Sequence, residues 1–423
     1  MLSHPLFYTL KNLRGNARGC VYTEPLWGIP FNLYVPYVSV YMLALGLSDQ
    51  QIGLIISIGM VFQVLSALLS GVITDKLGRK RATLIFDILA WSVPCLIWAV
   101  AQNFTYFLIA AMINGMWRIT MNSWTCLLVE DTDPEQLVDI YSWIYIAGLV
   151  AAFFTPFTGL LIRNFSLIPT MRGLYLFAVV MMTVKFLAMN AQVTETHRGL
   201  ARIHETKHQN YLAMLREYSG VLKQILRTRQ TLYTAGIMLV ISTCLMINNT
   251  FWSILVTEKL QIPAQNLALY PFVRSIVMLF FFFLVVPRIG RMPFRNPMLV
   301  GFAGFALSQL ILIAIPEKNY LLLLVSTFLE AGSLATVSPL MDRMVVVTVD
   351  ARERARIMAI IYVIVILITS PFGWIAGVLS DANRILPFVL NAGLFSVGGL
   401  LTVMAARTSP QDNDAREEAL SAS

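Results

Sequence analysis

Long, continuously apolar runs separated by short polar segments make up most of the chain. Twelve runs lie between clusters of charged residues, and each supplies most of the roughly 20 residues that a helix needs to cross a bilayer. They lie near 21–45, 52–74, 83–101, 105–129, 139–162, 172–191, 231–255, 266–287, 297–315, 320–341, 357–379 and 386–406. A membrane β-barrel would instead show short alternating segments. The pattern therefore predicts an all-α polytopic membrane protein with 12 transmembrane helices.

Composition supports this prediction. Hydrophobic residues make up 57% of the 423 residues and charged residues 13%, whereas soluble globular proteins average about 25% charged residues. A soluble fold and a disordered chain are both excluded. The N-terminal segment is polar and basic for too long to be a cleavable signal peptide, so we expect the first span to remain in the mature protein. The four cysteines have no metal-ligand spacing, which predicts buried thiols, with no disulfide and no metal.

The basic residues are distributed unevenly among the loops. If the N-terminus is placed inside, 23 of the 31 lysines and arginines fall in inner segments and five in outer loops. This asymmetry follows the positive-inside rule and predicts that both termini are cytoplasmic. The net charge of +8 is explained by this anchoring at the bilayer, so we expect no nucleic-acid partner.

A long polar stretch divides the spans into two sets of six. We predict an N-terminal six-helix bundle at 1–191, a cytoplasmic linker at 192–230, a C-terminal bundle at 231–406 and a cytoplasmic tail at 407–423. Apolar periodicity over 211–226 indicates an amphipathic helix at the inner membrane surface, with a plain linker as the alternative. Acidic segments at 133–135 and 350–353 each precede a span with a Pro-Phe pair, as a duplicated six-helix unit requires.

The loop between the second and third spans contains the most specific motif, residues 71–81, with the sequence GVITDKLGRKR. Gly71 lies one helical turn before Asp75 and permits close approach of a neighbouring helix. Gly78 turns the chain in a very short loop. Arg79 and Lys80 then begin the next span at the interface, where they can pair with nearby acids.

With this motif in this loop, the chain resembles the major facilitator superfamily. The resemblance implies two six-helix bundles, a central cavity and alternating access. It also implies that Asp75 and Arg79 join a cytoplasmic charge cluster with an acid at the end of span four, where Glu130 and Asp131 stand. Asp75 is further expected to face the start of span eleven, near 354–357. The corresponding second-half loop, 287–295, keeps the glycine and basic residues but lacks the aspartate.

Two partial motifs concern the direction of transport. Residues 117–122, with Trp117, Arg118 and Asn122, resemble the superfamily's span-four arginine motif, although Asn122 stands where a glycine is usual. Span five contains Gly148, Pro156 and Gly159, which partly resemble the antiporter motif. Together they favour efflux, and uptake stays open.

Four of the charged residues within predicted spans are singled out as candidates: Glu24, Arg118, Arg274 and Glu330. A charge in hydrocarbon costs about 2.5–3.5 kcal/mol, so it normally faces a cavity or a partner. The resemblance implies that spans one, four, seven and ten line the cavity. We therefore expect Glu330 to carry a coupling proton and Arg118 to orient an anionic group, with a structural pair inside one bundle as the alternative. Glu24 lies nearer the cytoplasmic end, where a snorkelling or gate role fits equally.

Asp87 and Lys185 lie close enough to the predicted inner surface to snorkel, and we interpret them as structural.

Aromatic and amide side chains recur on the spans expected to line the cavity. They are Trp27, Asn32, Tyr34 and Tyr37 in span one, Asn114, Trp117, Asn122 and Trp124 in span four, and Asn248, Asn249 and Trp252 in span seven. Helix packing is one explanation of the aromatics, whereas the amides need partners. Such a cavity suits a medium-sized amphipathic organic molecule without excluding a sugar. Pro25, Pro30 and Pro36 are expected to kink or break span one.

These features predict a proton-coupled secondary transporter that exports a small organic or drug-like compound. An uptake symporter or facilitator for a sugar or other nutrient is the alternative, and a membrane enzyme or scaffold is the third hypothesis. The chain has no phosphate-binding loop for ATP and no H-E-x-x-H or G-x-S-x-G motif. We expect no cofactor, no catalytic residues, and a monomer in the plasma membrane.

Overall fold

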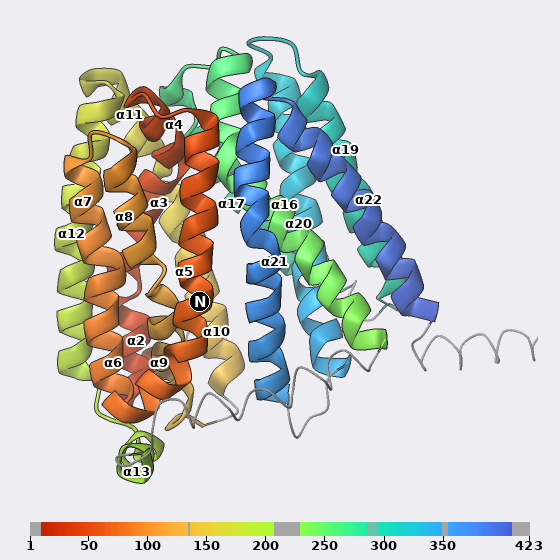
Figure 1. Ribbon diagram of the computed structural model, residues 1–423. Coiled ribbons are helices and arrows are strands. Elements are labelled where there is room, and N and C mark those ends of the chain that lie inside the picture. Colours follow the sequence, from red (N-terminus) through yellow and green to blue (C-terminus); the bar gives the residue numbers. More distant parts are fainter. Residues whose placement is uncertain are drawn as a thin grey trace, which may run out of the picture. The chain divides into compact units, whose positions relative to one another are not determined.

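The structure is a computed structural model that describes residues 10–133, 136–206, 229–285, 288, 292, 294–348 and 354–407. Helices account for nearly all of these residues, which contain no β-strand (Figure 1). The chain divides into an N-terminal unit, residues 1–217 with 264–269, and a C-terminal unit, residues 218–263 with 270–423. The predicted all-α architecture is confirmed.

Ten of the predicted spans are helical segments, some with a 3₁₀ or π-helical turn, that are apolar and long enough to cross a bilayer. Among the described residues these are Asp49–Leu77, Arg79–Val100, Asp139–Phe165, Leu167–Gln192, Thr231–Lys259, Ala264–Val285, Arg295–Ala314, Tyr320–Met341, Ile360–Ala382 and Leu386–Arg407. The other two predicted spans, 21–45 and 105–129, are also helical, but each is interrupted.

The first span is broken at two of its three prolines, as predicted. Its pieces are α2 (Gly15–Thr23), α3 (Pro25–Tyr34), a 3₁₀ turn (Val35–Tyr37) and α4 (Val38–Ala44). Pro25 begins α3 and Pro36 lies in the 3₁₀ turn, whereas Pro30 lies inside α3. Proline has no N–H to donate and its ring clashes with the preceding turn, which weakens the helical hydrogen bonding at each of these points. Glu24 therefore stands at a junction between two helices.

The fourth span contains a break that the sequence analysis did not predict. It consists of α8 (Phe104–Asn114) and α9 (Trp117–Val129), joined by a turn at Gly115. A Cβ atom at Gly115 would lie 2.9 Å from the Cβ of Phe62 and 3.0 Å from the backbone nitrogen of Gln63, both in α5 (Asp49–Leu77). Only glycine permits so close a contact between the two segments.

Helix α5 has well-defined ends. At its start, the hydroxyl of Ser48 accepts a hydrogen bond from the backbone of Gln51, whose side chain accepts one from the backbone of Ser48. This capping box satisfies two otherwise free donors. At its end, Gly78 adopts a φ of 84°, which favours glycine and turns the chain into the next helix.

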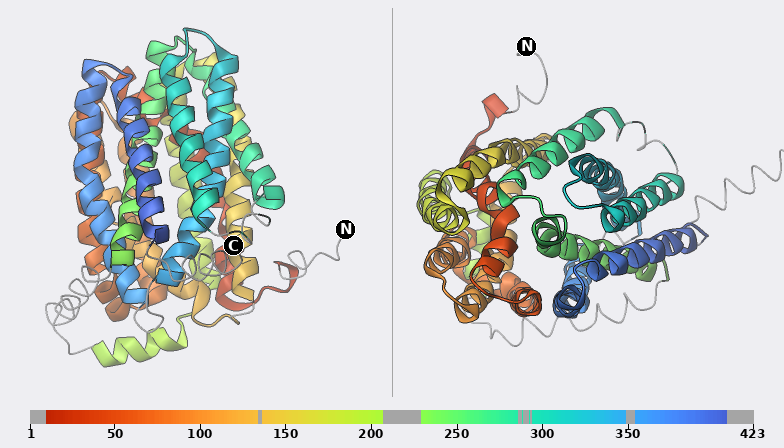
Figure 2. Two further views of the ribbon diagram at one scale, coloured as in Figure 1. Left: turned by 90° about the vertical axis from the view of Figure 1, so that its right-hand side faces the viewer. Right: turned by 90° about the horizontal axis from the view of Figure 1, so that it is seen from above.

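The N-terminal unit packs its helices around buried aromatic rings. Its remaining helices are α6 (Arg79–Asp87), α7 (Val93–Val100), α10 (Leu137–Ala151), α11 (Thr155–Phe165), α12 (Leu167–Gln192) and α13 (His197–Thr206). Tyr34, Tyr41 and Trp98 all contact the ring of Tyr175 on α12. Figures 1 and 2 show α13 lying across the end of this bundle, roughly perpendicular to its long helices.

The C-terminal unit has its own aromatic core. Its helices are α16 (Arg229–Ile254), α17 (Leu269–Phe280), α19 (Arg295–Ala314), α20 (Tyr320–Thr348), α21 (Arg354–Ala382) and α22 (Leu386–Arg407). Helix α19 packs against α20 and α22, and the rings of Phe305 and Phe395 stack at 4.5 Å between α19 and α22.

Several predicted segments lie outside the described residues. These are the whole amphipathic stretch at 211–226, most of the second-half loop at 287–295, the whole acidic segment at 350–353 and part of the one at 133–135.

The core of the C-terminal unit generates a stability prediction. We expect Gly398→Ala to lower the thermal unfolding midpoint, because three ring carbons of buried Phe302 lie within 3.0 Å of the new Cβ. Overpacking of this kind costs about 1–3 kcal/mol. Gly393→Ala on the same helix is the matched control, since no atom lies within 4 Å of its Cβ; alanine there should leave the midpoint unchanged or raise it. Equal midpoints for the two variants in detergent would contradict this packing.

Candidate functional site: charged clusters within the two units

The motif at 71–81 forms a charged cluster at one end of the N-terminal unit. Arg79, at the start of α6, lies between two carboxylates and is only 4% exposed. Its Nη1 is 3.1 Å from Asp75 Oδ1, and its Nε and Nη2 donate to the two oxygens of Glu130 at 3.1 Å each. The paired contact with Glu130, which ends α9, is the bidentate geometry that makes arginine–carboxylate bonds strong. The structure thus brings together three residues that the sequence analysis singled out.

The segment after α12 adds two groups to this cluster that the sequence analysis missed. The carboxylate of Glu195 accepts hydrogen bonds from the backbone N–H groups of Arg79 at 2.8 Å and Lys80 at 3.0 Å. It therefore caps the N-terminus of α6, where backbone donors lack partners. The hydroxyl of Thr196 donates to Glu130. The sequence offered one signal for this contact: Glu195 stands between two threonines shortly after a predicted span.

Helix α13 also contacts the cluster. Arg202 donates to Asp75 Oδ2 from Nε at 3.1 Å and from Nη2 at 2.8 Å. This hydrogen bonding raises the pKa of Arg202 above its ordinary value, so the guanidinium stays charged. Asp75 is therefore held by two arginines. We call Asp75, Arg79, Glu130, Glu195 and Arg202 the loop cluster. Asp131 is exposed beside it.

The expected approach of Asp75 to residues 354–357 remains a prediction, because the side chains at the start of α21 lie outside the described set.

A second group of charges lies inside the N-terminal unit. Lys185 Nζ on α12 is 3.6 Å from Glu24 Oε2, and the two side chains are 5% and 16% exposed. Asp87, the last residue of α6, is 4% exposed and accepts a hydrogen bond from the hydroxyl of Thr120. The expectation that Asp87 and Lys185 snorkel to the membrane surface is wrong. Snorkelling needs a path for the charged group to reach water, and both groups are instead enclosed by packed helices.

Among the described residues of the C-terminal unit, one ion pair joins two predicted spans. Arg274 Nη2 on α17 is 3.1 Å from Glu330 Oε1 on α20, with the side chains 30% and 12% exposed. Two of the four charged candidates singled out within the predicted spans are therefore partners inside one unit. Their sequence separation of 56 residues gave no indication of this pairing.

Arg118 and its neighbours lie on α9. The guanidinium is 4.1 Å from the ring centre of Trp117, a cation–π distance, and its Nε approaches the side-chain oxygen of Gln63 at 3.4 Å. Asn122, one turn further, donates to the hydroxyl of Thr74 at 3.3 Å. The amide that replaces the usual glycine thus joins α9 to α5.

The predicted amides of span seven differ in environment. Asn248 is buried and its side-chain oxygen accepts a hydrogen bond from Asn391 on α22 at 3.1 Å, whereas Asn249 is exposed. Trp252 packs edge-on against Tyr270 at 5.2 Å. Of these two amides, Asn248 takes part in the packing of the C-terminal unit and Asn249 does not.

The remaining predicted residues lie within the N-terminal unit. Tyr34 is 2% exposed and lies between Trp98 and Tyr175 in the aromatic core, a packing position. Gly148 lies in α10, and Pro156 occupies the first turn of α11, where its missing N–H costs no hydrogen bond. Gly159 of α11 touches the backbone of Gln265 in the 264–269 segment.

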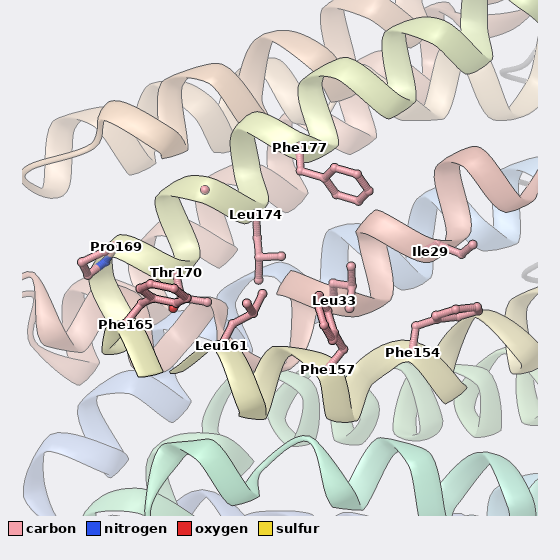
Figure 3. A pocket seen from close by; sticks show the side chains of 11 residues that line it. Ile29, Leu33, Phe154, Phe157, Leu161, Phe165, Pro169, Thr170, Leu174 and Phe177 are labelled. Atoms are coloured by element: carbon pink, nitrogen blue, oxygen red, sulfur yellow. The ribbon is translucent and has the colours of Figure 1, made fainter. Parts of the chain in front are cut away.

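A groove of about 570 Å³ lies between α3, α11 and α12 (Figure 3). Its walls are almost entirely hydrocarbon and include Phe154, Phe157 and Phe177, with Thr170 as the sole hydroxyl. Ligand sites combine apolar walls with a few polar groups that orient the ligand. This groove contains none of the charged or amide residues considered above, so we assign it no ligand.

The family profile of the Major Facilitator Superfamily matches residues 27–290 and 234–422. The chain therefore belongs to the major facilitator superfamily, as a multi-pass membrane transporter.

Relatives match over limited regions. The chain is 25% identical over 159 residues to an uncharacterized MFS-type transporter, YqjV, of Bacillus subtilis strain 168, covering 37% of this chain and 36% of YqjV. It is 31% identical over 103 residues to the quinolone resistance protein NorA of Staphylococcus aureus strain N315, covering 24% of this chain and 26% of NorA. The matches thus span about a third and a quarter of these two proteins.

Solved structures share the fold along most of the chain. The nucleoside transporter NupG, in the crystal structure of a mutant form, aligns with a TM-score of 0.73 at 15% identity, covering 92% of this chain and all of that one. The human organic anion transporter MFSD10 aligns with a TM-score of 0.60 at 17% identity, covering 91% and 98%. At these identities the likeness establishes the fold alone.

The loop cluster generates a stability prediction. We expect Arg79→Met to destabilise the protein by about 3–5 kcal/mol, because it leaves the largely buried Glu130 without its cation, whereas Asp75 keeps Arg202. Arg202→Gln, whose side chain is 38% exposed, should cost only about 0–1 kcal/mol. Thermal unfolding in detergent measures both. Adding Glu130→Gln to Arg79→Met should recover part of the loss, and no recovery would show that the contact is not energetically coupled.

Proposed function

We propose that this transporter is a proton-coupled exporter of a small organic molecule. The observation that carries the proposal is the Arg274–Glu330 pair, a carboxylate and a guanidinium 3.1 Å apart between membrane-spanning helices of a transporter. A charge in the hydrocarbon region is expensive and usually functional. Arg274 balances the negative charge of Glu330 when that carboxylate carries no proton. A proton bound to Glu330 would remove the same charge.

The chemistry of this pair suits coupling. In one state Glu330 is ionised, and its carboxylate can accept a hydrogen bond from a donor group of a substrate. In the other state it has taken a proton, and it no longer offers that negative charge to the substrate. Arg274, which is 30% exposed against 12% for Glu330, neutralises the carboxylate while neither is bound. Proton and substrate would then compete for one carboxylate, as antiport requires.

Alternating access needs a contact that holds one state and can be released. The loop cluster, with Arg79 between Asp75 and Glu130, fits such a lock at the cytoplasmic end of the N-terminal bundle. Arg118, stacked on Trp117, is our candidate for orienting an anionic part of the substrate. We further propose a plasma-membrane monomer with both termini cytoplasmic.

Two features favour export. The relative NorA is named for quinolone resistance, which efflux of a drug would produce, although the match covers 24% of this chain. Gly148, Pro156 and Gly159 supply part of an antiporter motif. Uptake of a nutrient by symport is the competing function.

A flux experiment separates the two directions. Ligands are first found by thermal stabilisation of the purified protein across drugs, sugars and organic acids, and hits are then tested in proteoliposomes under an imposed pH gradient. Antiport predicts that substrate accumulates on the side of higher proton concentration, because protons leaving that side drive substrate into it. Accumulation on the opposite side would establish symport. If the flux does not respond to the gradient, the hypothesis of proton coupling is rejected.

The coupling role of Glu330 makes a specific prediction. Glu330→Gln should abolish gradient-driven flux, to the level of empty liposomes, while sparing exchange of labelled for unlabelled substrate, because glutamine can neither bind nor release the proton. The measurement is driven flux against exchange in the same vesicles. Glu317→Gln, an exposed glutamate, is the matched control and should retain both. Full driven flux in Glu330→Gln would remove this residue from coupling.

A further inference from the structure

Three ionisable side chains meet inside the N-terminal unit, away from the residues assigned to the loop cluster and to coupling. Glu24 comes from the junction of α2 and α3, Asp87 from the end of α6, and Lys185 from the C-terminal third of α12. Lys185 is enclosed further by the rings of Trp124 and Phe186, at 5.9 Å and 5.3 Å from its Nζ. We call Glu24, Asp87 and Lys185 the buried cluster.

The charges in this cluster do not balance. Two carboxylates and one ammonium leave a net charge of −1 when all three are ionised. The lysine lies 3.6 Å from Glu24, whereas the described residues place no cation within 4.0 Å of Asp87. Moving an ionised carboxylate out of water costs several kcal/mol unless it is paired, and an isolated buried charge is normally neutralised instead.

The hydrogen bonding shows which group lacks a partner. Only 4% of the surface of Asp87 is exposed. Its Oδ1 accepts one hydrogen bond, from the hydroxyl of Thr120. Its Oδ2 is buried and has no hydrogen-bond partner among the described residues, and neither has Oε2 of Glu24. An ionised carboxylate accepts several hydrogen bonds, so Asp87 is poorly provided for as an anion.

Other titratable groups near the cluster do not supply the missing cation. The thiol of Cys20 on α2 is the additional ionisable neighbour, and it can only add negative charge. The described charged residues of the surrounding helices engage other partners: Arg18 the ring of Tyr22, Arg79 and Glu130 each other, Arg118 the ring of Trp117, and Arg172 the carbonyl of Ala101. The remaining basic residues of α6, Lys80 and Arg81, follow the loop at the other end of that helix.

We propose that the buried cluster is a proton-binding site that holds one proton, with Asp87 as its principal acceptor. A proton from water forms an O–H bond on a carboxylate oxygen, and the net charge of the cluster changes from −1 to 0. Glu24 and Lys185 then remain as a balanced ion pair. The site is separate from Glu330, which lies in the other unit, and it does not depend on the direction or substrate of transport.

Both acids stand at irregular points in their helices. Glu24 separates α2 from α3 and is followed by Pro25, which has no N–H to donate. Asp87 immediately precedes a π-helical turn at Ile88–Ser92, which packs against α12. Such turns occur often at functional sites and helix breaks absorb movement. Gain or loss of the proton would therefore act where the backbone of two helices is least constrained.

Infrared spectroscopy of the purified full-length protein tests the proposal directly. A protonated carboxylic acid has a carbonyl band distinct from that of a carboxylate. In the wild type we expect one component of this band, separate from any that Glu330 contributes, to appear and disappear with pH. Asp87→Asn should abolish it, because Glu24 and Lys185 alone are balanced. Glu330→Gln should leave it in place, and this variant also separates the outcome from failure of the proposed coupling role.

Isotope labelling covers the case in which Asp87→Asn does not fold. Aspartate labelled with ¹³C at the side-chain carboxyl should shift the band of the unmutated protein, whereas labelled glutamate should not. The proposal is overturned if the wild type shows no such band at any pH, if the band persists in folded Asp87→Asn, if only the glutamate label shifts it, or if Glu330→Gln removes it.

Discussion

A charge placed in the hydrocarbon of a bilayer must be neutralised by a partner, because water is not there to solvate it. This chain places several charged groups between its helices, and the positions of those groups explain much of the rest of the structure. Arg274 and Glu330 neutralise each other in the C-terminal unit. Lys185 and Glu24 do so in the N-terminal unit, with Asp87 beside them. Each pair joins different helices, so the need for neutralisation fixes which helices must stay in contact.

The same requirement acts on backbone groups. Where a span is interrupted, the freed N–H and C=O groups must find partners inside the protein. The first span uses prolines, which have no N–H to leave unpaired, and the fourth uses a glycine that lets α5 approach closely. In the first span the irregular backbone coincides with an ionisable residue, Glu24.

Much of this could be predicted from the sequence. Long apolar runs fixed the class, the three prolines indicated the break in span one, and the spacing of Asp75, Arg79 and Glu130 around a glycine turn indicated a charged cluster. These features are local or depend on the order of spans along the chain.

Other features depend on which helices become neighbours, and a single sequence does not contain that information directly. Lys185 was expected to reach the membrane surface because it lies near the end of its span, but the packing of α2, α6 and α12 encloses it. The partnership of Arg274 with Glu330, and the role of Glu195 as a cap on α6, likewise join residues far apart in sequence.

Residues 194–202, which follow α12, are attached to the motif at 71–81, and this attachment has a mechanical consequence. Asn16 exchanges hydrogen bonds with the backbone of Thr194, Glu195 holds the first turn of α6, and Arg202 holds Asp75. The polypeptide is thus fastened at three successive points before it continues in sequence towards the second unit. A change in the loop would therefore act directly on residues 194–202, so the loop cluster and the chain that leaves α12 must rearrange together.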